Sequence, residues 1–73
     1  MFKTGDIVRF HTMFKDRMFY TTAFYKIISI DTKKRSTVLN LSNNKKEIIH
    51  LYYLANAEKE YRKEKLNTLN DIN

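Results

Sequence analysis

The sequence predicts a mainly β domain, a small barrel of four to five antiparallel strands with a C-terminal α-helix. Short β-branched and aromatic runs recur between residues 7 and 54, which is typical of strands. Polar turn signals at residues 31–35 and 42–46 separate these runs. After residue 55 the chain becomes rich in Ala, Glu and Lys, which favour helix. We therefore expect one domain, with the barrel over residues 1–55 and a helix with a frayed tail over residues 56–73.

The first strand is expected at Ile7–Phe10, directly after a turn that contains the chain's only glycine. A polar and aromatic loop follows over residues 11–17. Residues 19–31 are dense in β-branched and aromatic side chains, so they predict one long second strand. Strict alternation along that strand places Tyr25 and Ile27 on the same face.

A third strand is expected over residues 36–41, with Val38 facing inward. Residues 47–54 are compatible with two structures. In the favoured one, residues 48–51 form a closing strand and the next three form a helical turn; in the other, residues 48–55 form an amphipathic helix. The terminal helix is expected over residues 55–66.

The composition excludes several kinds of site. The chain has no cysteine, so it has neither disulfides nor thiolate zinc sites, and its two histidines, His11 and His50, cannot supply four zinc ligands. We therefore expect no metal and no cofactor. No apolar run approaches the roughly 18 residues of a membrane span, and the first residues lack the apolar region of a secretory signal. These features predict a soluble, cytoplasmic protein that does not bind membranes.

The positive charge is concentrated in the first two thirds of the chain. The formal net charge is +6, and residues 1–46 carry ten Lys and Arg against three Asp. A basic surface of this kind attracts nucleic acid, anionic membranes or acidic proteins. Lys, Asn, Ile, Tyr and Phe make up 34 of the 73 residues, and all have AT-rich codons. Part of the lysine excess is therefore explained by an AT-rich gene, such as one from a bacteriophage, a plasmid or a low-GC bacterium.

Two segments carry a likeness to a known family. Residues 3–10 read Lys-Thr-Gly-Asp-Ile-Val-Arg-Phe, with a Gly-Asp-x-Val opening, and residues 48–54 read as a closing strand followed by a helical turn. Over residues 3–55 the chain resembles small SH3-like barrels of the KOW and Tudor kind. The resemblance implies binding of RNA, DNA or protein, or a structural role. The glycine that usually follows the opening strand is replaced by His11, which argues against KOW-type RNA binding.

Residues 14–20 interleave positive charge with large apolar groups, as single-stranded nucleic-acid sites do. In that interpretation Lys15 and Arg17 contact phosphates, while Phe14, Phe19 or Tyr20 stack on bases. In the alternative interpretation Phe14, Met18 and Phe19 close the open end of the barrel.

Two basic turns are further candidates. Residues 33–35 and residues 45–46 would clamp phosphates together if both turns lay at one end of the barrel. Otherwise they are solvated hairpin tips that discourage aggregation of strand edges. Both histidines are expected to be half-buried strand residues, and one glycine cannot build a phosphate-binding loop, so we expect no enzyme and no catalytic residue.

Two hypotheses follow. The first is a non-enzymatic nucleic-acid-binding barrel. Its expected contacts are Arg9, Lys15, Arg17, Lys33, Lys34, Arg35, Lys45 and Lys46. Its expected stacking or partner contacts are Phe14, Met18, Phe19, Tyr20 and Tyr53. The second is a small phage or mobile-element protein that binds and modulates an acidic host protein through Phe14, Met18 and Tyr20.

Overall fold

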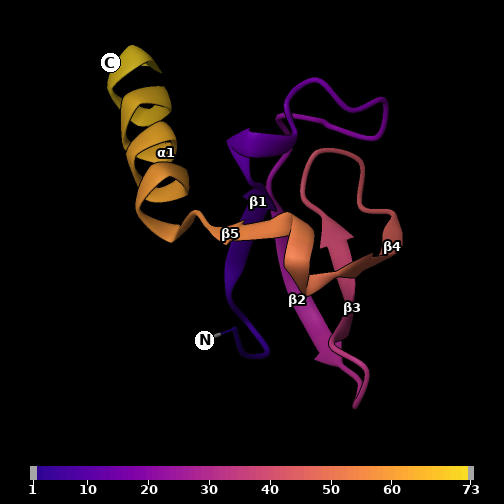
Figure 1. Cartoon of the computed structure of the whole chain (residues 1–73). Coiled ribbons are helices and arrows are strands. Elements are labelled where there is room, and N and C mark those ends of the chain that lie inside the picture. Colours follow the sequence, from indigo (N-terminus) through magenta and orange to yellow (C-terminus); the bar gives the residue numbers. More distant parts are fainter. Residues whose placement is uncertain (1, 73) are drawn as a thin grey trace.

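The computed structural model describes residues 2–72, and side chains over residues 2–65. Five antiparallel strands form one open sheet in the order β4-β3-β2-β1-β5, followed by one helix (Figure 1). The elements are β1 (Ile7–Phe10), η1 (Thr12–Phe14), β2 (Tyr25–Ile30), β3 (Arg35–Asn40), β4 (Lys46–His50), η2 (Leu51–Tyr53), β5 (Leu54–Asn56) and α1 (Glu58–Ile72), where η1 and η2 are 3-10 turns. The expected mainly β fold with a C-terminal helix is confirmed, with β4 and β5 as unpaired edges rather than a closed barrel.

One face of the sheet carries the core, to which every strand contributes. Its buried side chains are Val8, Phe10, Tyr25, Ile27, Val38, Ile49 and Leu54. Two buried polar groups are satisfied locally. The Ser36 hydroxyl donates to the Ile49 carbonyl at 2.7 Å, and the Asn40 side chain accepts from the Ser42 amide at 2.8 Å. The core therefore holds β3 against β4 without leaving these polar groups unpaired.

The second strand is shorter than expected, because β2 begins only at Tyr25. Phe19 and Tyr20 instead pack against Phe10, which holds the preceding segment across the end of the sheet. A register shift between Ile27 and Ser29 also interrupts the expected alternation. Ile28 points outward, as alternation with the buried Ile27 predicts, but Ser29 is exposed as well. Ile30, which strict alternation places on the face opposite to Ile27, packs against the core.

The closing part of the chain contains a strand that the sequence did not predict. The favoured strand and helical turn over residues 47–54 are confirmed as β4 and η2. Residues 54–56, expected in part as helix, form β5 because they pair with β1, with Leu54 opposite Phe10. The helix then begins at Glu58, whose amide is capped by the Asn56 side chain at 3.1 Å.

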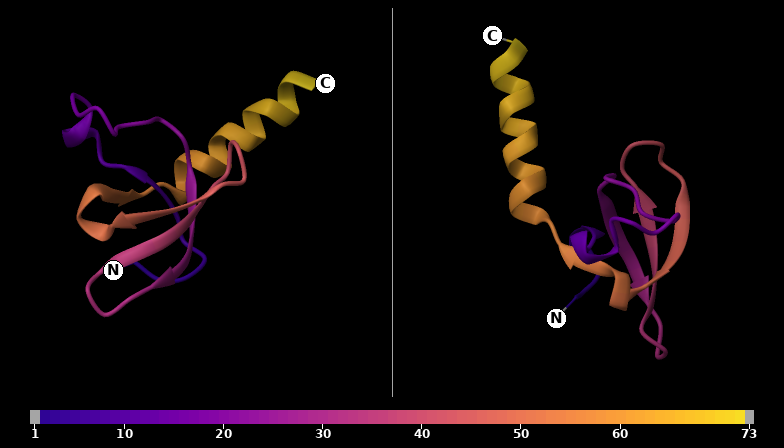
Figure 2. Two further views of the ribbon diagram at one scale, coloured as in Figure 1. Left: turned by 90° about the vertical axis from the view of Figure 1, so that its right-hand side faces the viewer. Right: turned by 45° about the horizontal axis from the view of Figure 1, so that its top comes forward.

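The helix also extends beyond its expected end at residue 66. Its backbone is helical to Ile72, and no glycine or proline interrupts that stretch; Asn73 lies outside the described residues. Its first turns are joined to β1 by an ion pair between Arg9 and Glu60 at 2.7 Å, and to the residue before β2 by a ring contact between Phe24 and Tyr61 at 5.3 Å. The rest of α1 runs away from the sheet (Figure 2).

Neighbouring isoleucines of β2 provide a matched test of this core. Ile27 is 1% exposed and Ile28 is 37% exposed. We expect Ile27→Val to lower the free energy of unfolding by about 1 kcal/mol, because it removes a methyl group from a packed core. Ile28→Val should lower it by less than half as much, as measured by urea denaturation. Equal losses would contradict the placement of Ile27 in the core and of Ile28 on the opposite face.

Candidate binding surface

Each 3-10 turn is capped by a histidine. The Nδ1 atom of His11 accepts a hydrogen bond from the Met13 amide, and that of His50 accepts one from the Tyr52 amide, both at 3.0 Å. The expectation that both histidines are half-buried strand residues is wrong in part: both are exposed, His11 precedes η1, and His50 is the last residue of β4. The two capped turns share one spacing in the sequence, since an aromatic residue lies three positions after each histidine.

The two capped turns pack against each other. The His11 amide donates to the Tyr53 carbonyl at 2.9 Å, and the rings of Phe14 and Tyr53 meet edge to face at 5.1 Å. Phe14 also contacts Tyr52, at 5.5 Å, and Phe19 contacts Tyr53, at 5.1 Å. Aromatic pairs in such arrangements contribute about 0.5–1.5 kcal/mol each beyond burial. The β1–β2 loop is therefore fixed on η2.

Most of the exposed large apolar side chains of the described residues lie on the segments that form this contact or on β4. Such side chains are Met13, Met18, Phe19, Ile28, Ile48 and Tyr52. All except Ile28 belong to the β1–β2 loop, β4 or η2, and we call those five residues the aromatic face. Contiguous apolar patches on a folded surface usually mark an interaction site.

A groove of about 290 Å³ joins the loop to β4. Phe19 and Tyr53 line one side of it, and residues 47–50 of β4 line the other. Phe10, from the core, is also part of its lining. The groove therefore connects the aromatic face to the open edge of the sheet.

The stacking residues expected from the sequence have different positions. Phe14 is buried, so the alternative in which it closes the end of the sheet applies to this ring. Tyr20 and Tyr53 are half-buried, whereas Met18 and Phe19 are exposed. Of the aromatic rings expected to stack, Phe19 is thus the one most open to a partner.

Two of the expected phosphate contacts are held by carboxylates. Arg9 pairs with Glu60, its Nη2 donates to the Tyr20 hydroxyl at 3.4 Å, and its guanidinium lies 5.9 Å from the centre of the Phe24 ring. The hydrogen bond to Glu60 raises the pKa of Arg9. Arg9 thereby links α1 to β1 and is not available as a free surface cation.

The second held cation is Arg35, whose Nε donates to Asp31 at 3.0 Å. The Arg35 and Lys33 amides also donate to the Asp31 carboxylate, at 3.0 and 2.8 Å. These hydrogen bonds, the one from the Arg35 amide above all, lower the pKa of Asp31. Asp31 thus organises the β2–β3 hairpin.

The remaining expected cations are exposed and make no ion pair within the described part of the chain. They are Lys15, Arg17, Lys33, Lys34, Lys45 and Lys46. The two basic turns, however, lie at opposite ends of β3 (Figure 1). The condition for a joint phosphate clamp is therefore not met.

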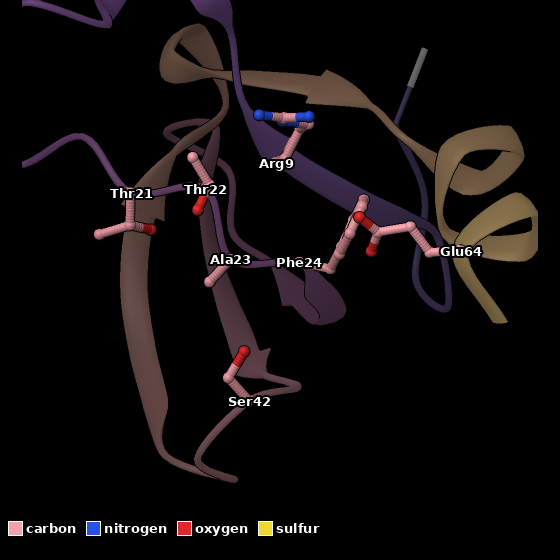
Figure 3. Close-up of a pocket in the computed structure, with 7 residues that line it drawn as sticks. All are labelled: Arg9, Thr21, Thr22, Ala23, Phe24, Ser42 and Glu64. Carbon is pink, nitrogen blue, oxygen red and sulfur yellow. The ribbon is translucent and has the colours of Figure 1, made fainter. Parts of the chain in front are cut away.

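A second cavity, which the sequence did not predict, lies beside α1. It measures about 570 Å³ and is lined by the segment 21–24, Arg9, Ser42 and Glu64 (Figure 3). Figure 3 shows Arg9 and Glu64 toward the helix side and the threonines opposite. Because Arg9 is already paired with Glu60, this cavity offers hydroxyl groups rather than a free cation.

Comparison with known proteins adds no relative: no family model, no curated protein and no solved structure matches the chain. Among the described residues, no three His, Cys, Asp or Glu side chains are grouped so that they could bind a metal ion. The part of the chain that the structure describes contains no helix with the length and apolar character needed to cross a membrane.

The cap on η2 can be tested by substitution. His50→Ala removes the acceptor for the Tyr52 amide and should lower the free energy of unfolding by about 1 kcal/mol. His50→Asn keeps a side-chain acceptor and should recover at least half of that loss in urea denaturation. If the Asn variant is no better than the Ala variant, the cap is not the source of the stability.

The Asp31 hairpin predicts a dependence on pH. Because folding lowers the pKa of Asp31, its contribution to stability is fully present above about pH 4 and is lost as the pH falls through the lowered pKa. Wild type should be more stable than Asp31→Asn near neutral pH, and the difference should shrink in acid. Asp16→Asn provides a control outside the hairpin. A difference that stays constant down to about pH 2 would rule out this role.

Proposed function

We propose that the protein is a non-enzymatic protein-interaction module that contacts its partner through the aromatic face. The observation that carries this proposal is that five of the six exposed large apolar side chains of the described residues belong to the β1–β2 loop, to η2 packed against it, or to β4, which shares a groove with the loop. Exposed apolar surface is unfavourable in water, and burying it against a partner removes that cost.

The aromatic face has the properties of an energetic centre for binding. Met13 and Tyr52 lie on turns held by the two histidine caps, and Phe19 packs against Tyr53, so binding would order little of this surface that is not already ordered. Met18 and Phe19 project from the same loop as Lys15 and Arg17. An apolar centre with a charged rim is typical of protein interfaces, and the positive rim favours an acidic partner.

The partner that we propose is a host protein. This chain would be the product of a phage or other mobile element, and it would bind and modulate that host protein. The AT-rich composition supports this proposal. A cytoplasmic location and membership of the SH3-like barrels of the KOW and Tudor kind stay predictions from the sequence.

Nucleic-acid binding is the second candidate, supported by the six exposed cations that have no ion pair within the described residues. The distribution of groups favours it less. Arg9 and Arg35 are held by carboxylates, Phe14 is buried, and the two basic turns are separated by the length of β3. Any such binding would be mainly electrostatic and weakly sequence-specific.

Capture from a lysate of the source organism or its host, with and without nuclease, tests the first candidate. Met18 is fully exposed, so Met18→Ser should leave the fold unchanged and reduce capture of a specific protein at least several-fold. Ile28→Ser, at the exposed apolar side chain of β2 that lies outside the aromatic face, is the matched control and should capture normally. The proposal would be contradicted if nuclease treatment removed the captured protein, or if Met18→Ser captured as much of that protein as the wild type.

Fluorescence anisotropy with labelled single- and double-stranded DNA and RNA tests the second candidate. Binding through the cations should weaken along a straight line in a log–log plot against salt, with a slope of about −0.9 per phosphate engaged on duplex DNA. Replacing Lys33 and Lys34 with Ser should make that slope shallower by about 0.9 for each phosphate that these two lysines engage. Absence of binding even at low salt removes this candidate.

A further inference from the structure

The outer edge of β4 has a defined set of free backbone groups. The Asn40 amide donates to the Lys45 carbonyl at 2.8 Å, and the Leu51 amide donates to the Lys34 carbonyl at 2.9 Å. Hydrogen-bonded and non-hydrogen-bonded pairs alternate along an antiparallel ladder. Between these two bonds, the residues of β4 that bond to β3 are therefore 47 and 49.

The intervening residues turn their backbone the other way. Lys46, Ile48 and His50 direct their amide and carbonyl groups toward the open edge, where the described residues supply no further strand. Ile48 is the centre of this edge and its side chain is 72% exposed. Such an edge is a template for the addition of another strand.

The surroundings of the edge select the side chains of an added strand. Successive side chains of a strand point to opposite faces. On the inner face they would enter the groove lined by Phe10, Phe19 and Tyr53, which suits apolar groups. On the outer face they would lie beside Lys46 and His50, with Ile48 between them, which suits acidic groups at the two ends of the strand.

We infer that β4 binds an extended acidic segment of a partner protein, with alternating apolar and acidic residues, as an added strand. Charge complementarity supports this occupant. Lys45 and Lys46 lie at the start of β4, beside the single carboxylate of that strand, Glu47. Lys34 lies opposite the residue that follows the end of β4, since its backbone carbonyl accepts from the Leu51 amide. A second copy of the chain would instead bring two proteins of formal charge +6 together.

His50 contributes a directional group at one end of the edge. Its Nδ1 accepts from the Tyr52 amide, so in the neutral imidazole the proton is on Nε2. Nε2 is then a donor on an exposed side chain that also lines the groove. An acidic side chain of the added strand is a suitable acceptor for it.

This inference rests on the proposed interaction function and names the chemistry of the partner. The test uses the full chain, labelled with ¹⁵N, and an acetylated, amidated peptide of sequence Val-Glu-Val-Glu-Val-Glu-Val. A matched peptide with Lys in place of Glu is the control. We expect the Glu peptide to shift the amide signals of Lys46, Ile48 and His50, to slow their hydrogen exchange, and to bind at least about tenfold more tightly than the Lys peptide.

Two variants at one position separate backbone pairing from side-chain contact. Ile48→Pro removes an outward amide without removing a bond to β3, and edge strands tolerate proline at such positions. Ile48→Pro should lower the affinity for the Glu peptide by about tenfold. Ile48→Thr, which keeps the amide, should lower that affinity by less than about threefold. Slowed hydrogen exchange in the wild type is a readout that needs no variant.

Several outcomes would overturn the inference. They are equal binding of both peptides, signal changes confined to the cavity beside α1, or no binding at about 1 mM Glu peptide. Sedimentation that shows a dimer abolished by Ile48→Pro would assign the edge to a second copy instead. If capture from lysate depends on Met18 while the Glu peptide does not bind, the proposed function stands and the β4 inference falls.

Discussion

The contact between η1 and η2 is the constraint on which the rest of this small structure depends. A single backbone hydrogen bond, from the His11 amide to the Tyr53 carbonyl, joins the start of one loop to the end of the other. The Phe14 ring, inserted between Tyr52 and Phe19, adds the apolar part of that contact. Without it, the long connection between β1 and β2 would cross one end of the sheet with few bonds, and the core beneath it would be open to water.

The charged residues fall into two groups. Arginines near the packed regions, Arg9 and Arg35, are tied to carboxylates and serve the architecture: one attaches α1 to β1, and the other fastens a hairpin. Lysines at the turns have no such partner within the described residues. Arg9 and Arg35 thus stabilise local structure, while Arg17 and the exposed lysines determine the electrostatic field around the molecule.

Local patterns predicted the parts of the fold that depend on neighbouring residues. The bounds of β1, the inward position of Val38 and the strand followed by a helical turn near residue 50 all follow from alternation and turn chemistry. Features set by distant pairing were not predictable in this way. Residues 54–56 form a strand because β1 lies beside them, and the ion pair of Arg9 with Glu60 joins positions 51 apart.

The candidate site was predicted in its residue types more than in its arrangement. The loop from Phe14 to Tyr20 does form part of the exposed surface, but burial of Phe14 depends on η2, which is remote in sequence. The histidine caps were missed because a lone histidine has no general sequence signature as a cap of a 3-10 turn. The open edge of β4 follows only from the register of the sheet, which composition does not encode.

The helix has a practical meaning for anyone who wishes to attach this protein to a surface. Fifteen residues of α-helix span about 22 Å. Because α1 runs away from the sheet, its far end is separated from the β1–β2 loop in every view (Figures 1 and 2). A dye, bead or fusion partner joined at that end would use α1 as a built-in spacer and leave both the loop and the β4 edge unobstructed.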